Sequence, residues 1–203
     1  MKWILVIPHL VVLAFAWVAY VLLSIVAFFA ILVTGVYPRP LFEFNVGVMR
    51  WSWRVAYYTW AGLGTDQYPP FTLDDVPDYP ARLEIPYPER LSRGLVLVKW
   101  WLLTIPHYII VGIFIGSPFW FGRWVGGGLV SICTFVAAIT LAVTASYPRQ
   151  LFDLILGMDR WVLRVAAYAG LMTDAYPPFR LDTGGTDPAS PMAFEHAVAD
   201  VPV

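Results

Sequence analysis

Two histidines are the residues whose type and spacing could do chemistry in this chain of 203 residues. His9 and His107 each follow a proline inside an apolar stretch, in the repeated tripeptide Ile-Pro-His. An ionisable side chain at membrane depth suggests function, and two imidazoles could be the axial ligands of a b-type haem. Alternatively, each imidazole satisfies backbone carbonyls that Pro8 and Pro106 leave without a donor. We favour this structural role and expect no cofactor, because two histidines alone do not define a haem site.

Other reactive constellations are absent from the sequence. It holds no Gly-rich phosphate loop, no His-Glu-x-x-His, no Gly-x-Ser-x-Gly and no Cys/His set with metal spacing. Cys133 is the one cysteine, which excludes a disulfide within the chain. Asp66 and Asp174 each precede a Tyr-Pro-Pro-Phe segment, and such carboxylates more often end a helix and order a turn than act as an acid/base pair. We therefore expect a protein that is not an enzyme and binds no metal.

The composition indicates a membrane protein. Hydrophobic residues make up 59% of the chain and charged residues only 13%, whereas an ordinary soluble domain is about 25% charged. The net charge of −1 removes the basic face that nucleic-acid binding would need. Residues 10–36, 94–116 and 125–145 are apolar stretches that meet the roughly 20 residues needed to cross the hydrocarbon core as a helix. These features predict an all-α integral membrane protein that contacts the lipid bilayer.

The chain contains an internal duplication. Tyr-Pro-Arg-Pro-Leu-Phe-Glu at 37–43 returns as Tyr-Pro-Arg-Gln-Leu-Phe-Asp at 147–153. Thr-Asp-x-Tyr-Pro-Pro-Phe closes both copies, at 65–71 and at 173–179, and Lys-Trp precedes both Ile-Pro-His motifs. Internal repeats of this kind mark a repeated structural unit. We assign unit one to residues 1–78, unit two to 79–182 and a disordered tail rich in Gly, Pro, Ser and Ala to 183–203.

Each unit begins with an apolar segment that we expect to be a transmembrane helical hairpin. Unit two has Pro and Gly in the middle of residues 94–146, which predicts a hairpin tip near 117–124. In unit one, residues 3–36 form either one tilted helix about 51 Å long or a tight hairpin that re-enters the membrane. We favour the hairpin, because it would place both Ile-Pro-His motifs on the same side as both Tyr-Pro-Arg motifs.

An amphipathic helix follows each apolar segment, over residues 41–63 and 150–172. Glu43, Arg50 and Arg54 share one helical face, which unit two repeats with Asp153, Arg160 and Arg164. Such helices suit the membrane interface; the alternative is a tilted span whose arginines pair with the carboxylates inside a bundle. Our candidates for contact with a partner are Arg50, Arg54, Arg160, Arg164, Trp51, Trp53, Trp161 and the small residues Gly112 and Gly116.

A connector rich in proline and acid, residues 64–93, joins the two units. Its prolines enforce extended backbone, and the alternation at 82–85 resembles a short strand. We favour a rigid strap packed over the amphipathic helices; the alternative is a docking strap for another protein. Most arginines lie outside the apolar segments, so the positive-inside rule places the amphipathic helices, the connector and the tail on the cytoplasmic side of a bacterial inner membrane, with a multi-pass topology.

The motifs resemble an uncharacterised bacterial membrane family, common in actinobacteria and known only as a domain of unknown function. Tyr-Pro-Glu-Arg-Leu-Ser-Arg at 87–93 and the repeated segments carry the likeness over residues 2–182. It implies a tandem helical membrane domain and no activity. We expect a non-enzymatic accessory or scaffold subunit of a larger membrane assembly, in contact with other membrane subunits or a second copy. The alternatives are a small oligomeric transporter, channel or lipid-handling protein, and a bis-His haem electron-transfer subunit.

Overall fold

The computed structural model describes residues 2–61, 63–116, 128–144 and 146–181, and these parts are helical with no strand. The all-α prediction is therefore confirmed, whereas the strand expected at 82–85 is wrong: this segment is extended but pairs with no second strand among the described residues. The helices are α1 (Lys2–Leu5), α2 (Ile7–Thr34), α3 (Arg39–Tyr58), α4 (Arg93–Val98), the π-helix η1 (Lys99–Leu103), α5 (Ile105–Ile115), α6 (Leu129–Thr144) and α7 (Arg149–Ala169).

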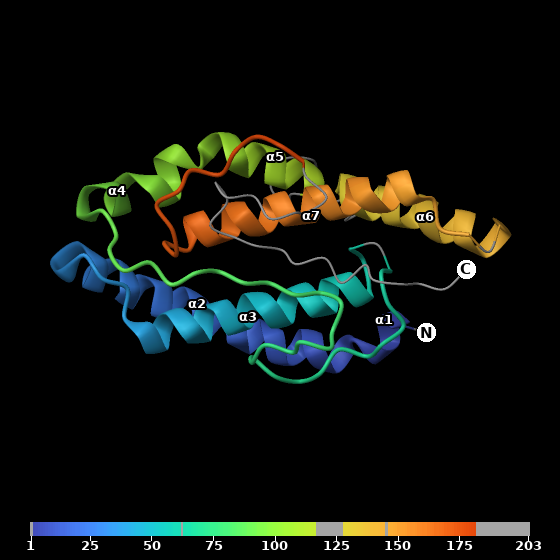
Figure 1. Ribbon diagram of the computed structural model, residues 1–203, viewed down its shortest axis with the longest axis horizontal. Helices are drawn as coiled ribbons and strands as arrows, with labels where there is room; N and C mark the ends of the chain where they lie inside the picture. Colours follow the sequence, from blue (N-terminus) through green and yellow to red (C-terminus); the bar gives the residue numbers. More distant parts are fainter. Residues whose placement is uncertain (1, 62, 117–127, 145, 182–203) are drawn as a thin grey trace.

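Unit one is a pair of antiparallel helices, α2 and α3 (Figure 1). The 28 residues of α2 run without a break, so the hairpin favoured for unit one is wrong. No glycine or proline interrupts the sequence between Pro8 and Gly35, and the helix ends where Gly35 takes a left-handed conformation, with φ of 74°. Pro38 then stands at the N-cap of α3. The Ile-Pro-His and Tyr-Pro-Arg motifs therefore lie at opposite ends of α2.

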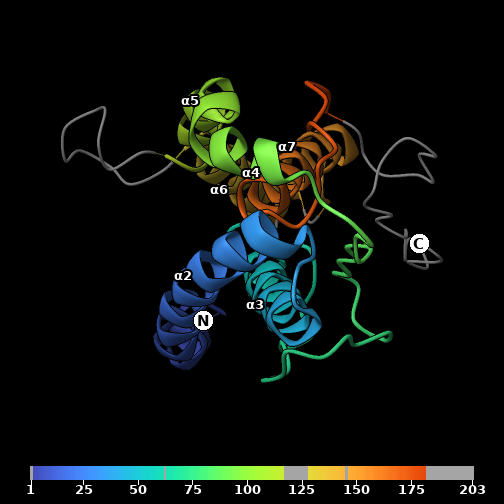
Figure 2. The same cartoon turned by 90° about the vertical axis from the view of Figure 1, so that its left-hand side faces the viewer.

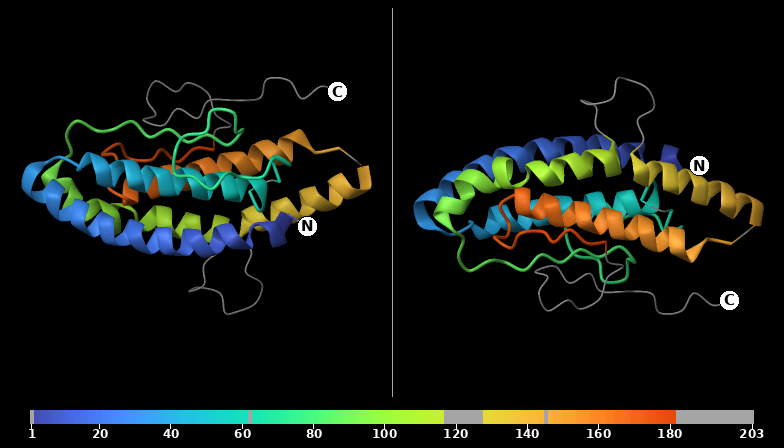
Figure 3. Two further views of the ribbon diagram at one scale, coloured as in Figure 1. Left: turned by 90° about the horizontal axis from the view of Figure 1, so that it is seen from below. Right: turned by 90° about the horizontal axis from the view of Figure 1, so that it is seen from above.

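Unit two repeats this plan with a rod made of several helices. The segments α4, η1, α5 and α6 follow one another lengthwise, and α7 returns beside them (Figures 1 and 3). The backbone N–H of Gly128 donates to the carbonyl of Ile115 at 3.1 Å, so α6 begins where α5 ends. The hairpin predicted for 94–146 is therefore wrong, because the chain continues onward instead of folding back; its proposed tip near 117–124 lies outside the described residues. A bend of 46° separates η1 from α5.

We call α2 and the series α4–η1–α5–α6 the apolar rods. The two units run in opposite directions: α4 begins beside the end of α2, where the N–H of Leu91 donates to the carbonyl of Gly35 at 2.9 Å. Seen along the long axis, both rods lie on one side of the molecule, α3 and α7 lie in the middle, and the connecting segments cover the other side (Figure 2). The molecule is thus layered from an apolar to a polar side.

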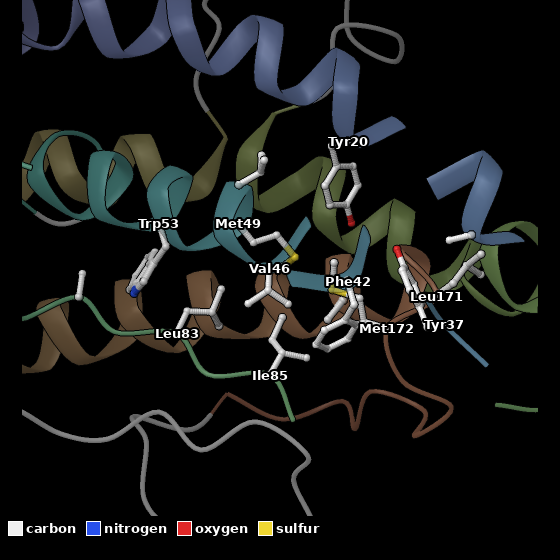
Figure 4. Close-up of a cluster of buried hydrophobic side chains, with 14 of the residues drawn as sticks. Tyr20, Tyr37, Phe42, Val46, Met49, Trp53, Leu83, Ile85, Leu171 and Met172 are labelled. Atoms are coloured by element: carbon white, nitrogen blue, oxygen red, sulfur yellow. The ribbon is translucent and has the colours of Figure 1, made fainter. Parts of the chain in front are cut away.

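The main core lies between these layers and draws on both units (Figure 4). Tyr20 comes from α2, Leu83 and Ile85 from the connector, and Leu171 and Met172 from the chain after α7. The rest of the labelled cluster is Tyr37, Phe42, Val46, Met49 and Trp53. Because the core holds side chains from the connector, the connector is part of the folded structure, as the strap prediction required.

The helices α3 and α7 are interior elements. Predicted for 41–63 and 150–172, they span Arg39–Tyr58 and Arg149–Ala169. Twelve of the 20 residues of α3 are buried, because the rod covers one face and the connector another. The polar stripe of α3 faces the chain's own connector, as expected for a strap packed over this helix, and its arginines bind backbone carbonyls of the strap instead of the carboxylates of the helix.

We call residues 63–92 strap one and residues 173–181 strap two. Strap one passes close to the backbone of α3 at Gly47, where an added Cβ would lie 2.7 Å from the Cβ of Leu73 and 2.8 Å from its carbonyl oxygen. Backbone atoms cannot move aside as a side chain can, so only glycine fits at this position.

Gly47→Ala is expected to lower the free energy of unfolding by about 1–3 kcal/mol through overpacking. Gly94→Ala in α4 is the matched control, since nothing lies within 4 Å of its Cβ position. Urea titrations of both variants in detergent, followed by tryptophan fluorescence, measure the difference. An equal effect of the two substitutions would show that strap one does not contact α3 at Gly47.

Candidate functional site

His9 lies in an aromatic cage at the start of α2. Its side chain is fully buried and stacks on Phe71 of strap one, with ring centroids 3.7 Å apart and an interplanar angle of 11°. Tyr68 lies at 5.0 Å. The indole N–H of Trp51 donates to Nδ1 of His9 at 3.0 Å. That nitrogen accepts a hydrogen bond and therefore carries no proton, so the imidazole is the neutral tautomer protonated at Nε2.

His107 occupies the equivalent cage at the start of α5. It is fully buried and stacks on Phe179 of strap two at 4.4 Å and 9°. Tyr176 lies at 4.8 Å and Trp161 at 5.1 Å. The copies differ in one contact, because the indole N–H of Trp161 donates to the carbonyl of Pro178 at 3.0 Å instead of to the histidine. The aromatic cage therefore forms in both copies, with and without a hydrogen bond from the indole to the histidine.

The two cages change the interpretation of the histidines. Each imidazole is packed against rings of its own unit, and the structure does not bring His9 and His107 together as ligands of one haem. Nor do they pair with carbonyls freed by the prolines: His9 accepts from an indole, and both nitrogens of His107 are buried without a hydrogen-bond partner in the described residues. Their structural role is to hold the Tyr-Pro-Pro-Phe segments against the rods by ring stacking.

Arginines of α3 and α7 bind the backbone of the straps. Arg54, only 2% exposed, donates from Nη1 to the carbonyl of Asp74 at 2.8 Å and from Nη2 to the carbonyl of Thr72. Arg50 donates from Nε to the carbonyl of Leu83 at 2.8 Å. In unit two, Arg164 donates to the carbonyl of Arg180 at 3.0 Å, at the position equivalent to Thr72. These guanidinium groups satisfy carbonyls of extended backbone that has no sheet partner.

A lysine completes each site: Lys2 lies in α1, just before α2, and Lys99 is the first residue of η1, just before α5. Lys2 donates to the carbonyl of Thr65 at 2.7 Å and pairs with Asp66 at 2.6 Å. Lys99 donates to the carbonyl of Thr173 at 3.0 Å and pairs with Asp174 at 2.8 Å. Lys99 is fully buried, whereas the Lys2 side chain is 26% exposed. The hydrogen bond and charge of Lys2 hold the pKa of Asp66 below its ordinary value.

Sequence reasoning missed these ion pairs, although the signal was present. Lys-Trp and Thr-Asp both recur in the two copies, and a repeated charge next to a repeated opposite charge is a reason to test a pairing. The turns expected around the carboxylates do form, but through the threonines: Oγ1 of Thr65 accepts from the N–H of Gln67 and Oγ1 of Thr173 from that of Ala175, each at 3.1 Å. The carboxylates of Asp66 and Asp174 are therefore available to pair with Lys2 and Lys99.

We call each set of lysine, histidine cage and arginine a strap anchor. Both anchors use their polar groups to hold a strap of the same chain against a rod, so what they recognise is backbone carbonyl and aromatic rings. Within the described ranges, no three His, Cys, Asp or Glu side chains gather so that they could hold a metal ion. The polar groups of the anchors therefore bind other parts of the same chain.

Most of the residues expected to contact a partner lie inside the chain. Those buried are Trp51, Trp53, Trp161, Arg54, Arg160 and Arg164, and Arg50 is half-buried against strap one. Gly112 and Gly116 are half-buried at the end of α5, where the N–H of Gly116 donates to the carbonyl of Gly112 at 2.9 Å. These residues are therefore used, wholly or in part, in packing within the chain.

One carboxyl group in α7 is unfavourably placed. Oδ2 of Asp159 is buried without a hydrogen-bond partner in the described residues, and burial raises the pKa of Asp159 to about 8. The unfolded chain releases this proton near pH 4, so the folded state binds it more tightly. Stability should therefore fall by about 1 kcal/mol per pH unit between pH 5 and pH 8 and level off above.

Asp159→Asn is expected to remove this part of the pH dependence and to stabilise the protein at pH 8. Asp153→Asn, at an exposed position of the same helix, is the control and should leave the slope unchanged. Urea unfolding at a series of pH values measures both. A slope that Asp159→Asn leaves intact would show that another group is responsible.

Comparison with protein families places both repeats in one family. Residues 1–72 and 97–180 match the model of a family described as a domain of unknown function, DUF4389. The two matched segments agree with the duplication seen in the sequence and with the two strap anchors. No curated protein and no solved structure matches the chain.

Proposed function

Since the chain belongs to the DUF4389 family, whose description assigns no activity, we propose a function from its geometry: a non-enzymatic membrane-bound accessory or scaffold subunit. The apolar rods hold it in the bilayer, and strap one presents a rigid acidic surface to another subunit of a membrane assembly. The observation that carries the proposal is the division of the molecule into an apolar and a polar side, with its reactive side chains used for internal anchoring (Figure 2).

The rods supply the membrane-binding surface. One helix, Ile7–Thr34, is long and apolar enough to span a membrane, and only 17% of its most apolar stretch is buried. Large apolar side chains point outward along both rods, for example Phe15 at 74%, Phe135 at 63% and Val143 at 79% exposure. Soluble proteins rarely expose apolar patches beyond a few hundred Å², so an apolar environment is the expected partner of this side.

Strap one supplies the surface for a protein partner. Between residues 63 and 92 it carries six carboxylates and two arginines, a net charge of −4 in a chain of net charge −1. Asp78 and Glu84 are exposed, while the anchors hold the strap in place. A rigid acidic surface favours a basic partner, because fixed charges attract an opposite surface at little ordering cost. We place this side in the cytoplasm of a bacterial inner membrane, following the positive-inside rule.

Photo-crosslinking in living cells tests the proposal. A photoreactive amino acid at Asp78 or Glu84 is expected to give a discrete crosslinked protein species, and the same probe at Phe15 is expected to give none. Replacing two exposed carboxylates of strap one, Asp78→Lys with Glu84→Lys, should abolish a crosslink from a probe at position 89 while leaving the unfolding transition unchanged. The absence of any discrete protein adduct from strap positions would overturn the proposed function.

A second function has one observation in its favour. The two units run in opposite directions (Figure 3), and inverted repeats are common in secondary transporters. A small oligomeric transporter, channel or lipid-handling protein would show solute flux or lipid transfer in proteoliposomes. We rank it second, because the reactive side chains of both units are used in the strap anchors.

A further inference from the structure

We propose that this protein lies flat in a single leaflet of the membrane, with both rods parallel to the bilayer plane and both straps on one aqueous side. The proposal rests on the membrane-binding part of the proposed function and goes beyond it. It replaces the expectation of transmembrane spans with a monotopic arrangement, in which a lipid surface covers the exposed face of the rods.

Strap one extends from one end of α2 to the other. Just before α2, Lys2 of α1 binds Thr65 and Asp66. At its end, Gly35 binds Leu91. A helix of 28 residues is about 42 Å long, so an irregular polar segment of fewer than thirty residues extends beside the whole rod, as Figure 3 shows for the connector along α3.

The middle of strap one is as polar as its ends. There Arg54 donates a hydrogen bond to the carbonyl of Asp74, and Arg50 donates one to the carbonyl of Leu83. Asp78 lies between these two residues of the strap and is exposed. If α2 crossed the bilayer, this carboxylate and the extended backbone around it would lie within the roughly 30 Å hydrocarbon core. Lipid-exposed irregular backbone does not occur there, and a carboxylate costs several kcal/mol. A spanning α2 whose strap faces lipid is therefore incompatible with the anchored strap.

The relation between the units fits the flat arrangement. The two units run in opposite directions, yet both rods lie on one side of the molecule and both straps on the other (Figure 2). The two-fold relation thus has its axis along the direction from rods to straps. If that axis is parallel to the membrane normal, the rods of both units face the same side of the membrane. The duplication then doubles the apolar area that contacts lipid, which is what a protein bound at the interface requires.

Exposed polar groups on the rods are adapted to an environment without water. Thr140 and Thr144 donate to the carbonyls four residues before them, at 2.9 and 2.7 Å. The hydroxyl of Tyr108 donates to the carbonyl of Trp100 at 2.6 Å, and the indole of Trp101 to that of Leu97 at 2.8 Å. Groups that face water need no internal partner, whereas groups that face hydrocarbon do. This pattern favours lipid as the occupant of the rod face.

Labelling of single cysteines from the two sides of a membrane tests the proposal. Gln67, Asp78 and Glu89 are exposed at the start, middle and end of strap one. Each is replaced by cysteine in the full chain carrying Cys133→Ser, and sealed right-side-out and inside-out vesicles are treated with a membrane-impermeant maleimide. Val18→Cys on the outer face of α2 is the control that should label from neither side.

We expect all three strap positions to label from the same side and to be protected from the other. Labelling of positions 67 and 89 from opposite sides would overturn the proposal. In that case a protected position 78 would indicate a single span, and a reactive position 78 would indicate an oligomer around a water-filled centre. Protection of all three from both sides would also overturn it. A missing crosslink from strap one would instead end the scaffold function and leave the orientation standing.

Discussion

Asp174→Asn should lower the free energy of unfolding by about 3 kcal/mol, because it leaves the ammonium group of Lys99 buried without a counter-charge. Lys99 is fully buried, and Oδ1 of Asp174 lies 2.8 Å from its Nζ. Oδ2 of the same carboxylate accepts from the N–H of Ser92 at 2.6 Å, which ties strap two to the start of α4. The substitution therefore breaks a contact between the strap and the rod of unit two. Urea unfolding in detergent measures the effect.

The duplication supplies the matched control for this substitution. Asp66→Asn removes the equivalent carboxylate from the pair with Lys2, but the side chain of Asp66 is 96% exposed. Exposed ion pairs contribute about 0–1 kcal/mol, so the loss should fall in that range. Equal losses for the two substitutions would show that burial of Lys99 does not govern the strength of its anchor.

Arg54→Met is the second substitution with a large expected effect, about 2–4 kcal/mol, because it leaves the strap carbonyls of Thr72 and Asp74 without their donor. Methionine keeps most of the volume, so the loss reports the hydrogen bonds. Strap one should also become sensitive to protease between residues 72 and 84, which a general loss of stability would not confine to one segment. Limited proteolysis followed by mass spectrometry measures the site of cleavage.

Arg90→Met is the control for Arg54→Met. Arg90 lies on the same strap and is exposed, and surface substitutions of this kind usually change stability by no more than about 0.5 kcal/mol. Its proteolysis pattern should match that of the unsubstituted protein. Cleavage spread evenly over the chain in Arg54→Met would contradict a specific role in holding strap one.

The sequence predicted the helices and the duplication but not the direction of the chain. Apolar and amphipathic periods are local, so α2, α3 and α7 could be located to within a few residues. The Pro and Gly after Ile115 marked a break in the second rod, but a break does not specify whether the next helix folds back or continues. In the structure the N–H of Gly128 donates to the carbonyl of Ile115, so that α6 continues the rod from the end of α5. No local sequence signal indicates this direction.

The strap anchors were predicted only in part. The histidines were selected because they are ionisable groups in apolar helices, and the structure gives them aromatic partners from a strap about sixty residues or more away. The arginine stripe of α3 was interpreted as the polar face of an interfacial helix or as arginines paired with carboxylates inside a bundle, since periodicity shows which residues share a face but not which atoms they bind. Here the cover is the chain's own extended backbone, held by Arg54.

Fluorescence quenching by brominated lipids measures most directly whether the rods lie flat on one side of the bilayer. Val11, Val18 and Phe29 are exposed on one face of α2, and bimane attached to cysteine at each position, in the Cys133→Ser chain, reports its depth. A flat rod predicts the same quenching depth at all three positions, near the upper part of one leaflet. A profile with Val18 deepest and Val11 and Phe29 shallow would place α2 across the bilayer and contradict the account.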